Sequence, residues 1–491
     1  MKYYSTRDKS NIVTAAQAIV QGLASDGGLF VPETILAVPL SEIEQLCKMD
    51  YRERAVAIMS KYLDEFTQDE LRSFVRGAYA DNYDNTEIAP TRFLNDNTGV
   101  LELWHGPTCA FKDMALQMLP RLLTASLKKL GETRKVCILV ATSGDTGKAA
   151  LEGFADVEGT SIVVFYPRDG VSDVQKLQMT TQRGENVFVS AVEGNFDDAQ
   201  TGVKAIFSDR EFAKKLDEKG IFLSSANSIN WGRLLPQVVY YFSAYCDYIN
   251  SGKIEMGDEI DFCVPTGNFG DILAGWYAKK MGLPVRRLIC ASNRNNVLTD
   301  FINTGMYDRN REFFATISPS MDILVSSNLE RLLFMLSDDI CVKGWMNELK
   351  TVGKYDVGAK VLAEIQADFD GGFTNDDEAK AFIRELFKGS SYLMDTHTAD
   401  AFAVLSNMYK TGEDFPTVIV STASPYKFAD SVLEALGEDS SLSGAELIER
   451  LSAVTGTTAP KPLTGLDSRE VRFTNCTAKE QMPDVVMNFL G

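Results

Sequence analysis

Six short apolar runs, rich in β-branched residues, recur through the chain and alternate with helical stretches. They lie at residues 136–141, 161–166, 187–192, 260–264, 286–291 and 417–421. Strands that are apolar on both faces belong to parallel sheets, which are covered by helices on both sides. Ligands of such sheets bind at the carboxyl ends of the strands. The pattern therefore predicts an α/β fold whose functional residues lie in the loops that follow strands.

The regions that flank this pattern are mostly helical. Residues 11–24 have the periodicity of an amphipathic helix, and helical patterns continue to the linker predicted at 84–97. Residues 320–412 also favour helices, with a turn predicted at 368–377. We therefore expect three parts: a mainly helical N-terminal domain at 1–95, a first catalytic part at 96–225, and a second catalytic part with a helical tail at 226–491.

Composition argues against several classes of protein. A net charge of −19 over 491 residues disfavours binding to nucleic acids and to anionic membranes, although a local basic pocket can still bind an anion. With two histidines in the chain, neither a histidine-built metal site nor a Ser-His-Asp triad is expected. The chain has no run of about 18 apolar residues, no signal-peptide core and no C-x-x-C pair among its eight cysteines. We expect a cytoplasmic protein with reduced thiols.

The segment Gly106–Leu116 contains Lys112 between apolar neighbours, after a tight Pro-Thr entry. A solvated surface lysine is one interpretation. A part-buried lysine instead loses some of its charge and becomes a usable amine nucleophile. Two glycine-rich loops, Thr142–Gly147 and Thr266–Asp271, follow predicted strands and open helices, which suits them to bind anions. Together these features indicate a pyridoxal-phosphate enzyme in which the lysine forms a Schiff base and a glycine-rich loop holds the phosphate.

Taken together, these segments resemble the threonine synthase family in its long form, which has an extra N-terminal domain. The likeness runs from residue 1 to about residue 435 and rests on five motifs in the same order. The motifs are Tyr4–Arg7 with Gly27–Pro32, His105–Asp113, Thr142–Gly147, Asn227–Arg233 and Gly267–Asp271. The resemblance implies pyridoxal-phosphate fold type II, which is tryptophan synthase β-like, with parallel-rich sheets covered by helices.

The resemblance also implies a role for each segment. Lys112 is the catalytic residue, which bonds to the cofactor and moves protons. Cofactor contacts are implied for Lys112, Gly267, Asn268, Phe269, Gly270, Asp271, Thr422 and Asp145. Substrate contacts are implied for Thr142, Ser143, Gly144, Thr146, Asn227, Ser228, Asn230, Arg233 and Lys427.

For Thr422 and Asp145 the resemblance also implies what the side chain does. The Thr422 hydroxyl is expected beside the pyridine nitrogen of the cofactor, which it keeps neutral. Asp145 stands where relatives often carry an asparagine beside the phenolic oxygen of the cofactor. We expect Asp271 to act through its backbone or as a helix cap, because a carboxylate is an unfavourable neighbour for a phosphate.

The chain departs from the family in one segment. Many relatives read Thr-Ala-His-Pro-Ala-Lys-Phe where this chain has Ser424 for the histidine and Tyr426 for the second alanine. Any role of that histidine is therefore absent or moved. His105 and His397 lie in family-like segments, and a structural hydrogen-bonded role is one interpretation for each. His105 is the better functional candidate, because it lies seven residues from Lys112.

The reaction implied by the resemblance converts O-phospho-L-homoserine and water to L-threonine and phosphate, by γ-elimination and β-addition, as the last step of threonine biosynthesis. A pyridoxal-phosphate-dependent phospholyase or dehydratase that releases a 2-oxo acid is the alternative, because the two differ in water access to the β-carbon. A binding protein without cofactor is a third hypothesis, disfavoured by Lys112 and both glycine-rich loops. Oligomeric state, effectors and lid closure are left open by the sequence.

Overall fold

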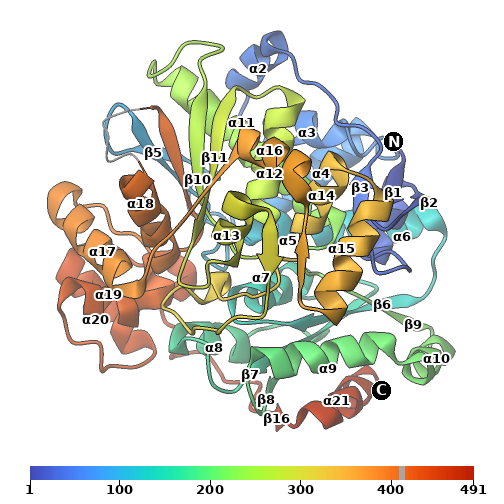
Figure 1. Cartoon of the computed structure of the whole chain (residues 1–491). Coiled ribbons are helices and arrows are strands. Elements are labelled where there is room, and N and C mark those ends of the chain that lie inside the picture. Colours follow the sequence, from blue (N-terminus) through green and yellow to red (C-terminus); the bar gives the residue numbers. More distant parts are fainter. Residues whose placement is uncertain (409–414) are drawn as a thin grey trace.

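The computed structural model describes residues 1–408 and 415–491 (Figure 1). Among these residues, two mainly parallel sheets lie in separate halves of the molecule, and helices cover both faces of each. The predicted α/β class is confirmed, and all six strands expected from the apolar runs are present. No helix in the described ranges has both the length and the apolar character needed to cross a membrane.

The smaller sheet has five described strands, all parallel, in the order β16-β8-β7-β6-β9. Alternate residues of β6 (Lys135–Ala141) point to opposite cores: Val136 and Ile138 pack in one, Cys137 and Leu139 in the other. The strands are β6 (Lys135–Ala141), β7 (Thr160–Pro167), β8 (Val187–Val192), β9 (Ile221–Ser224) and β16 (Cys476–Thr477). The surrounding helices are α7 (Asp145–Phe154), α8 (Asp173–Thr180), α9 (Phe196–Ser208), α10 (Arg210–Glu218) and α21 (Met482–Leu490).

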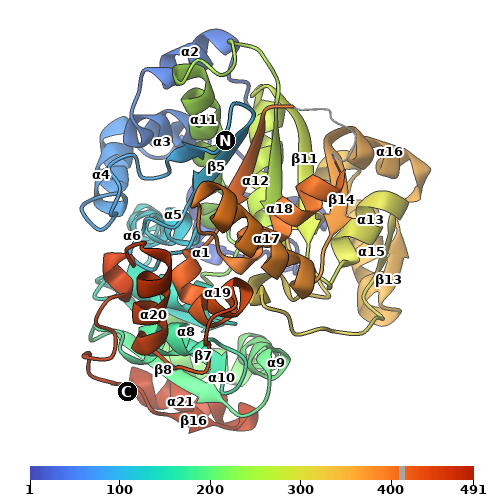
Figure 2. The same ribbon diagram turned by 90° about the vertical axis from the view of Figure 1, so that its left-hand side faces the viewer.

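The larger sheet has six described strands in the order β14-β11-β10-β15-β5-β4, and Figure 2 shows it above the smaller one. All neighbours are parallel except the edge pair β4 and β5. The strands are β4 (Thr91–Phe93), β5 (Thr98–Glu102), β10 (Ile260–Pro265), β11 (Val285–Ser292), β14 (Phe369–Phe373) and β15 (Thr417–Ser421). Phe262 and Val264 face the core that contains α11 (Trp231–Asn250) and α12 (Gly270–Met281), whereas Cys263 faces α18 (Thr396–Met408).

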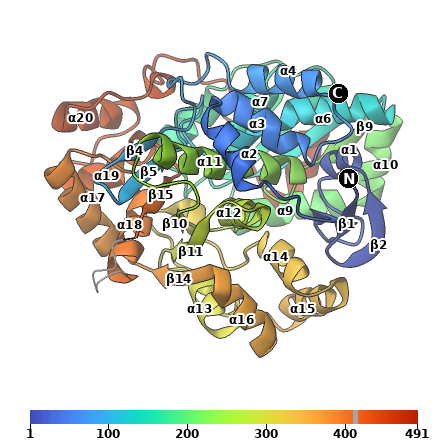
Figure 3. The same ribbon diagram turned by 90° about the horizontal axis from the view of Figure 1, so that it is seen from above.

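The N-terminal region packs against α11, as Figure 3 shows for its blue helices. It contains α1 (Ala15–Gln21), α2 (Leu40–Cys47), α3 (Tyr51–Ser60) and α4 (Gln68–Ala78), with a small antiparallel sheet of β1 (Tyr3–Ser5), β2 (Asp8–Val13) and β3 (Phe30–Pro32). The other helices include α5 (Asp113–Leu116), α6 (Leu119–Leu130), α13 (Val297–Thr304), α14 (Leu329–Leu336), α15 (Asp339–Thr351), α16 (Gly358–Asp368), α17 (Asp376–Ser390), α19 (Ala429–Leu436) and α20 (Ala445–Thr455). Short pieces are β12 (Met306–Asp308), β13 (Lys354–Asp356), and the 3₁₀ turns η1 (Pro319–Met321), η2 (Pro425–Phe428), η3 (Lys461–Leu463) and η4 (Lys479–Gln481).

The helix predicted over residues 11–24 is wrong in its first part. Asp8–Val13 forms β2 and pairs with β1, and Ile12 in this strand is 49% exposed. The helix begins only after Thr14, where Thr14 and Gln17 form a capping box. Pairing with a distant strand decides this segment against its helical periodicity.

Two other predicted segments also gain strand pairing. The linker predicted at 84–97 contains β4, which pairs with β5, and the turn predicted at 368–377 contains β14, which extends the sheet beside β11. Strands also cross the predicted domain boundaries, since β5 joins the larger sheet and β16 of the tail joins the smaller one. The division at residues 95 and 225 stays a prediction.

In both sheets the order in which the chain adds strands reverses beside the strand that precedes a glycine-rich loop. In the smaller sheet the chain runs outward from β6 to β8 and then returns to the other side of β6 as β9. In the larger sheet it runs outward from β10 to β14 and returns beside β10 as β15. Such switch points open a crevice at the carboxyl ends of the strands. The loops after β6, β9, β10 and β15 are therefore placed where an α/β protein binds its ligand.

The contact between α7 and α5 depends on a glycine. A Cβ atom on Gly153 would lie 2.1 Å from the backbone oxygen of Leu116. We expect Gly153→Ala to lower the free energy of unfolding by about 1–3 kcal/mol, because the two helix backbones have to separate. Gly344, exposed in α15 with open space around it, is the control; Gly344→Ala should be neutral or stabilise by up to about 1 kcal/mol. Urea unfolding of both variants tests this, and equal stabilities would contradict the close contact.

Candidate active site

Lys112 lies where the chain enters α5 after β5, and it is 9% exposed. The preceding backbone is tied to the segment after β15, because Phe111 N–H donates to the Thr422 oxygen at 2.8 Å and Ala110 bridges to Ala423. Thr108 is held in turn by Asp113, whose carboxylate accepts both its N–H and its hydroxyl. Two neighbouring strand ends therefore hold the lysine in place.

The surroundings of Lys112 favour a neutral amine. Burial lowers the pKa of the lysine to about 8, and the positive charges of Arg233 and Lys427 act in the same direction. The Asp145 carboxylate opposes this shift from 3.8 Å away. A large fraction of the amine is therefore neutral near pH 8, as the predicted nucleophile requires.

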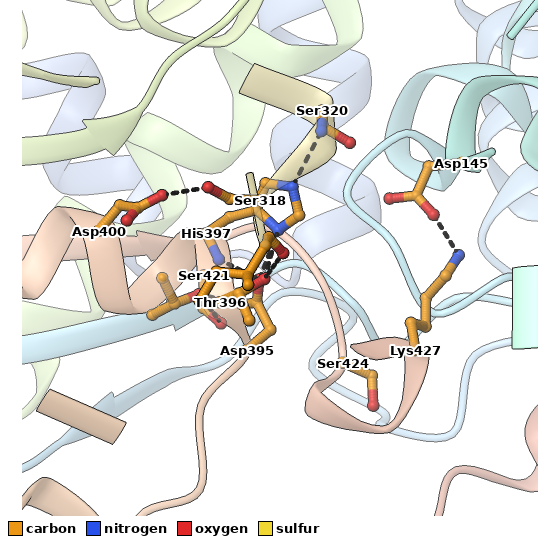
Figure 4. Close-up of polar contacts among 12 residues, drawn as sticks. Asp145, Ser318, Ser320, Asp395, Thr396, His397, Asp400, Ser421, Ser424 and Lys427 are labelled. Carbon is orange, nitrogen blue, oxygen red and sulfur yellow. Dashed lines mark hydrogen bonds and ion pairs between the residues drawn. The ribbon is translucent and has the colours of Figure 1, made fainter. Parts of the chain in front are cut away.

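Asp145 joins the two halves of the molecule. It is the first residue of α7, and its carboxylate pairs at 2.7 Å with Lys427 of η2, which follows β15 of the larger sheet, as Figure 4 shows. Lys427 is fully buried and also donates to the Thr108 oxygen at 2.9 Å. Burial alone would raise the pKa of Asp145, but the charges of Lys427 and Lys112 outweigh it and hold the pKa well below its usual value. Lys427, predicted to bind substrate, is thus engaged with Asp145.

The loop Thr142–Gly147 has two kinds of hydroxyl group. The Thr142 hydroxyl accepts the N–H groups of Gly144 and Gly147, so it stabilises the loop itself. Gly144 has a φ of 131°, and a side chain there would collide with Gln175. The hydroxyls of Ser143 and Thr146 are half-buried and have no partner among the described residues. These two hydroxyls are the ones available to a ligand.

The loop Gly267–Asp271 begins α12 with Phe269 in the left-handed conformation, at a φ of 60°. This turn directs the loop backbone across the amino end of the helix, where N–H groups favour an anion. Gly267 and Gly270 permit close neighbours: a Cβ on Gly267 would lie 2.5 Å from the Ser320 oxygen. The oxygen of Asn268 accepts the backbone and side-chain N–H groups of Asn328.

Asp271 points away from this loop. Its carboxylate accepts the hydroxyls of Tyr240 and Tyr241 at 2.6 and 2.8 Å, and burial raises its pKa to about 6. The expected helix cap is therefore absent, because no side chain of the described residues accepts a hydrogen bond from the N–H groups at the start of α12. The other expectation, contact through the backbone, agrees with the loop geometry.

In the segment after β9, the side chain of Asn230 is used in the fold, whereas that of Arg233 keeps an N–H group without a partner among the described residues. Asn230 caps α11 with its oxygen on Gly232 N–H, and its amide nitrogen donates to the Ile19 oxygen, so its side chain is structurally engaged. Arg233 is 2% exposed, donates from Nη1 to the Ala226 oxygen, and has no partner for Nε among the described residues. Burial lowers the pKa of Arg233 to about 10, which leaves it charged at neutral pH.

The other predicted residues Ser228, Asn227 and Thr422 have few side-chain contacts among the described residues. Ser228 accepts a hydrogen bond from Asn328, which links the loops after β9 and β10. Asn227 is half-buried, and only its backbone has described contacts. Thr422 is buried beside Lys112, and its neighbour Ser421 accepts from Trp104 at 3.1 Å.

His397 lies behind the loop of Gly267, a position in the fold that the sequence analysis did not predict. Its Nε2 accepts the N–H of Ser320, and its Nδ1 lies 2.9 Å from Asp395, as Figure 4 shows. Its ring packs against Phe428 at 4.8 Å. Because Ser320 lies directly against Gly267, His397 supports the glycine-rich loop from behind. The neighbouring Asp395 was the signal that could have indicated this role.

Gln175 and His105 complete the surroundings. Gln175 donates to Asp145 at 2.8 Å and also closes the capping box of α8 with Ser172, which a capping-box search would have found. His105, the favoured functional histidine, lies between Asp84 and Glu102. Burial lowers its pKa, but the hydrogen bonds to these carboxylates raise it to about 9. Both ring nitrogens of His105 are therefore engaged by carboxylates, and its functional role stays a prediction.

The departure from the family at Ser424 and Tyr426 also has a structural use. Ser424 begins η2, where its hydroxyl accepts the N–H of Tyr426. The Tyr426 hydroxyl contacts Thr457 at 2.7 Å and Ser452 at 3.1 Å. Tyr426 thus links the segment that carries Lys427 to α20 of the tail.

Comparison with known proteins identifies three matching family models along the chain. The model described as threonine synthase N terminus matches residues 2–79, pyridoxal-phosphate dependent enzyme matches 80–345, and threonine synthase, C-terminal, matches 398–486.

Individual proteins match over similar lengths. Threonine synthase-like 1 of Homo sapiens is 42% identical over 86% of this chain, which spans only 58% of that protein. Threonine synthase of Saccharomyces cerevisiae is 36% identical over 98% of each chain. The crystal structure of pyridoxal-phosphate-bound threonine synthase from Brucella melitensis is 37% identical, with a TM-score of 0.88 over 100% of this chain and 99% of that one.

The position of His397 leads to a test of the loop it supports. We expect His397→Leu to weaken pyridoxal phosphate binding by about tenfold or more, because the half-buried Ser320 N–H loses its acceptor. His397→Gln, whose side-chain oxygen can replace the ring nitrogen, should retain most of the affinity. Equilibrium dialysis measures binding, and melting temperatures check that both variants fold. Wild-type affinity in the folded leucine variant would show that the contact does not support the loop.

Proposed function

Because the chain belongs to the threonine synthase family of pyridoxal-phosphate-dependent enzymes, we propose that it converts O-phospho-L-homoserine and water to L-threonine and phosphate. One observation carries the proposal. Lys112 is a buried amine with a pKa of about 8, at the point where loops from both parallel sheets meet. A surface lysine has no such environment.

The residues of this site fit pyridoxal phosphate. The amino end of α12 and the backbone of Gly267–Gly270 suit a phosphate group, and Lys112 supplies an amine for the aldehyde. The buried Nε of Arg233 lacks a protein partner among the described residues, and it is the position assigned below to the phosphate of the substrate. When bound, the cofactor supplies an electron sink for negative charge on the substrate carbons.

In the proposed reaction Lys112 has two tasks. Its amine would hold the cofactor, and its Nζ, when it is free, is placed to remove and return protons at the substrate carbons. Asp145 holds this amine from 3.8 Å, while Lys427 balances the charge of the carboxylate. The burial of the cluster keeps bulk water from these groups.

The two anionic ends of the substrate need different partners. The free hydroxyls of Ser143 and Thr146, with nearby N–H groups at the start of α7, suit the carboxylate. The leaving phosphate needs a cation, and Arg233 is a buried cation whose field reaches Lys112 and which, unlike Lys427, has no ion pair among the described residues. Asn227 and Ser228 lie in the loop that precedes α11, the helix of Arg233, and complete the proposed substrate contacts.

A product assay decides between this proposal and the phospholyase or dehydratase alternative. Purified holoenzyme is incubated with O-phospho-L-homoserine, and threonine, 2-oxobutyrate and phosphate are measured together. Equal amounts of threonine and phosphate support the proposal, whereas 2-oxobutyrate in place of threonine overturns it. The comparisons with full-length relatives favour threonine synthesis over the alternative.

The proposal also includes a cytoplasmic location and a small-molecule substrate. The eight cysteines support the cytoplasmic location, because all of them are free thiols and six are buried. The net charge of −19 supports the absence of a nucleic-acid partner.

The lowered pKa of Lys112 leads to a pH prediction. Since only the neutral amine attacks an aldehyde, the rate at which apoenzyme captures pyridoxal phosphate should rise with pH and level off above about pH 8. Borohydride reduction followed by peptide mapping measures the label on Lys112 at each pH. Lys112→Ala is the control and should carry no label at this position. A rate that still rises at pH 10, as for an ordinary lysine, would refute the role of burial.

Arg233 leads to a prediction about the substrate phosphate. A charge-assisted hydrogen bond contributes about 1.5–3 kcal/mol, so Arg233→Ala should lower kcat/KM by about 10- to 150-fold while cofactor content stays near wild type. Arg233→Lys should recover only part of this loss, because ammonium provides a point charge without the planar fork. Steady-state phosphate release and melting temperatures test both variants. Wild-type kcat/KM in Arg233→Ala would place the phosphate elsewhere.

A further inference from the structure

A polar cavity of about 360 Å³ lies away from the residues described so far, between the smaller sheet's helices and the tail. Its walls come from α7, from the segment that follows α8, and from the tail. The lining residues are Lys148, Glu152, Thr181, Gln182, Arg183 and Arg469. A second cavity of about 400 Å³ shares Thr181, Arg183 and Arg469 with it, and its other charged lining residues are Arg472, Asp156, Glu185 and Glu470.

The first cavity is positively charged in a strongly acidic protein. Three cationic side chains line it against a single carboxylate, that of Glu152. The whole chain carries a net charge of −19, so this local excess opposes the overall field. Lys148 pairs with Glu152, so Arg183 and Arg469 are the cations of the cavity that have no carboxylate partner among the described residues, and a bound anion would balance their charge.

The arginines are held in place by backbone oxygens rather than by carboxylates. Arg469 donates from Nη2 to the Pro462 oxygen at 3.0 Å. Arg472, which lines the second cavity, donates from Nη1 to the oxygens of Gln182 and Gly184 and so fixes the turn that carries Arg183. Across residues 1–408 and 415–491, none of these three arginines forms an ion pair. A guanidinium held by one edge keeps its other N–H groups for a ligand.

The floor of the cavity is a buried lysine on the helix that begins with Asp145. Lys148 is 5% exposed, and its Nζ contacts Glu152 at 2.7 Å and the Gln182 side chain. The same helix, α7, therefore lines both the cavity, through Lys148, and the candidate active site, through Asp145. They remain separate sites, because Lys148 is directed to the cavity and Asp145 to Lys112 and Lys427.

We propose that this cavity is a binding site for a small dianion, which carries either a tetrahedral oxyanion such as a phosphoryl group or two carboxylates. Arg469, which is held through the Pro462 oxygen, supplies a directed donor, the exposed Arg183 supplies a second guanidinium, and the buried Lys148 supplies positive charge beside Glu152. The volume of the cavity limits the ligand to a small metabolite. The inference does not depend on the proposed reaction, since none of these residues has a role in it.

Binding of two probes to the holoenzyme tests the site. Sulfate represents the tetrahedral oxyanion and malonate the dicarboxylate, and each is titrated by calorimetry at constant ionic strength. We expect saturable binding of at least one probe, and the probe that binds more tightly identifies the class of ligand. Failure of both probes to saturate would overturn the proposal.

Variants locate the bound probe. Arg183→Gln combined with Arg469→Gln should weaken binding at least tenfold, since both directed donors are lost. Arg168→Gln, which removes an exposed arginine of the same half outside the cavity, should bind as wild type does. Arg233→Ala should also bind normally. Loss of binding in Arg233→Ala with retention in the double variant would assign the anion to the active site and overturn the inference.

Discussion

The buried ion cluster of Asp145, Lys427 and Lys112 is the interaction on which the arrangement of the molecule depends. A carboxylate without solvent is strongly unfavourable unless cations and hydrogen-bond donors replace the lost water. Asp145 receives this compensation from Lys427 and Gln175, which come from segments far apart in the chain. The two parallel sheets therefore have to meet at this cluster, because neither half can satisfy the charges alone.

The same cluster sets the chemistry of Lys112. Burial favours the neutral amine, and the carboxylate at 3.8 Å partly restores the charged form, so the pKa settles near 8 rather than far lower. Lys427 limits the effect of Asp145 by pairing with it at a shorter distance. The lysine is thus placed in the pH range where one group can act both as nucleophile and as proton carrier.

Contacts behind the loops determine their shape as much as the glycines do. Gly267 can lie close to Ser320 only because it lacks a side chain, and His397 then holds Ser320 by its N–H. On the other side of the site, Tyr426 links the segment of Lys427 to the tail through Thr457. The tail therefore does more than cover the surface, since it also contributes β16 to the smaller sheet and Arg469 to the cationic cavity.

The sequence by itself determined the α/β class, the six apolar strands, the part-buried position of Lys112 and both glycine-rich loops, because these depend on local periodicity and on the order of motifs. The tertiary structure decided three things that no local pattern contains. Pairing across the chain made Asp8–Val13 a strand in spite of its helical periodicity. Side-chain direction turned Asp271 toward two tyrosines and Lys427 toward Asp145. Long-range packing placed His397 behind the loop of Gly267. Each of these outcomes depends on partners far away in the sequence, and only the folded chain brings those partners within hydrogen-bonding distance.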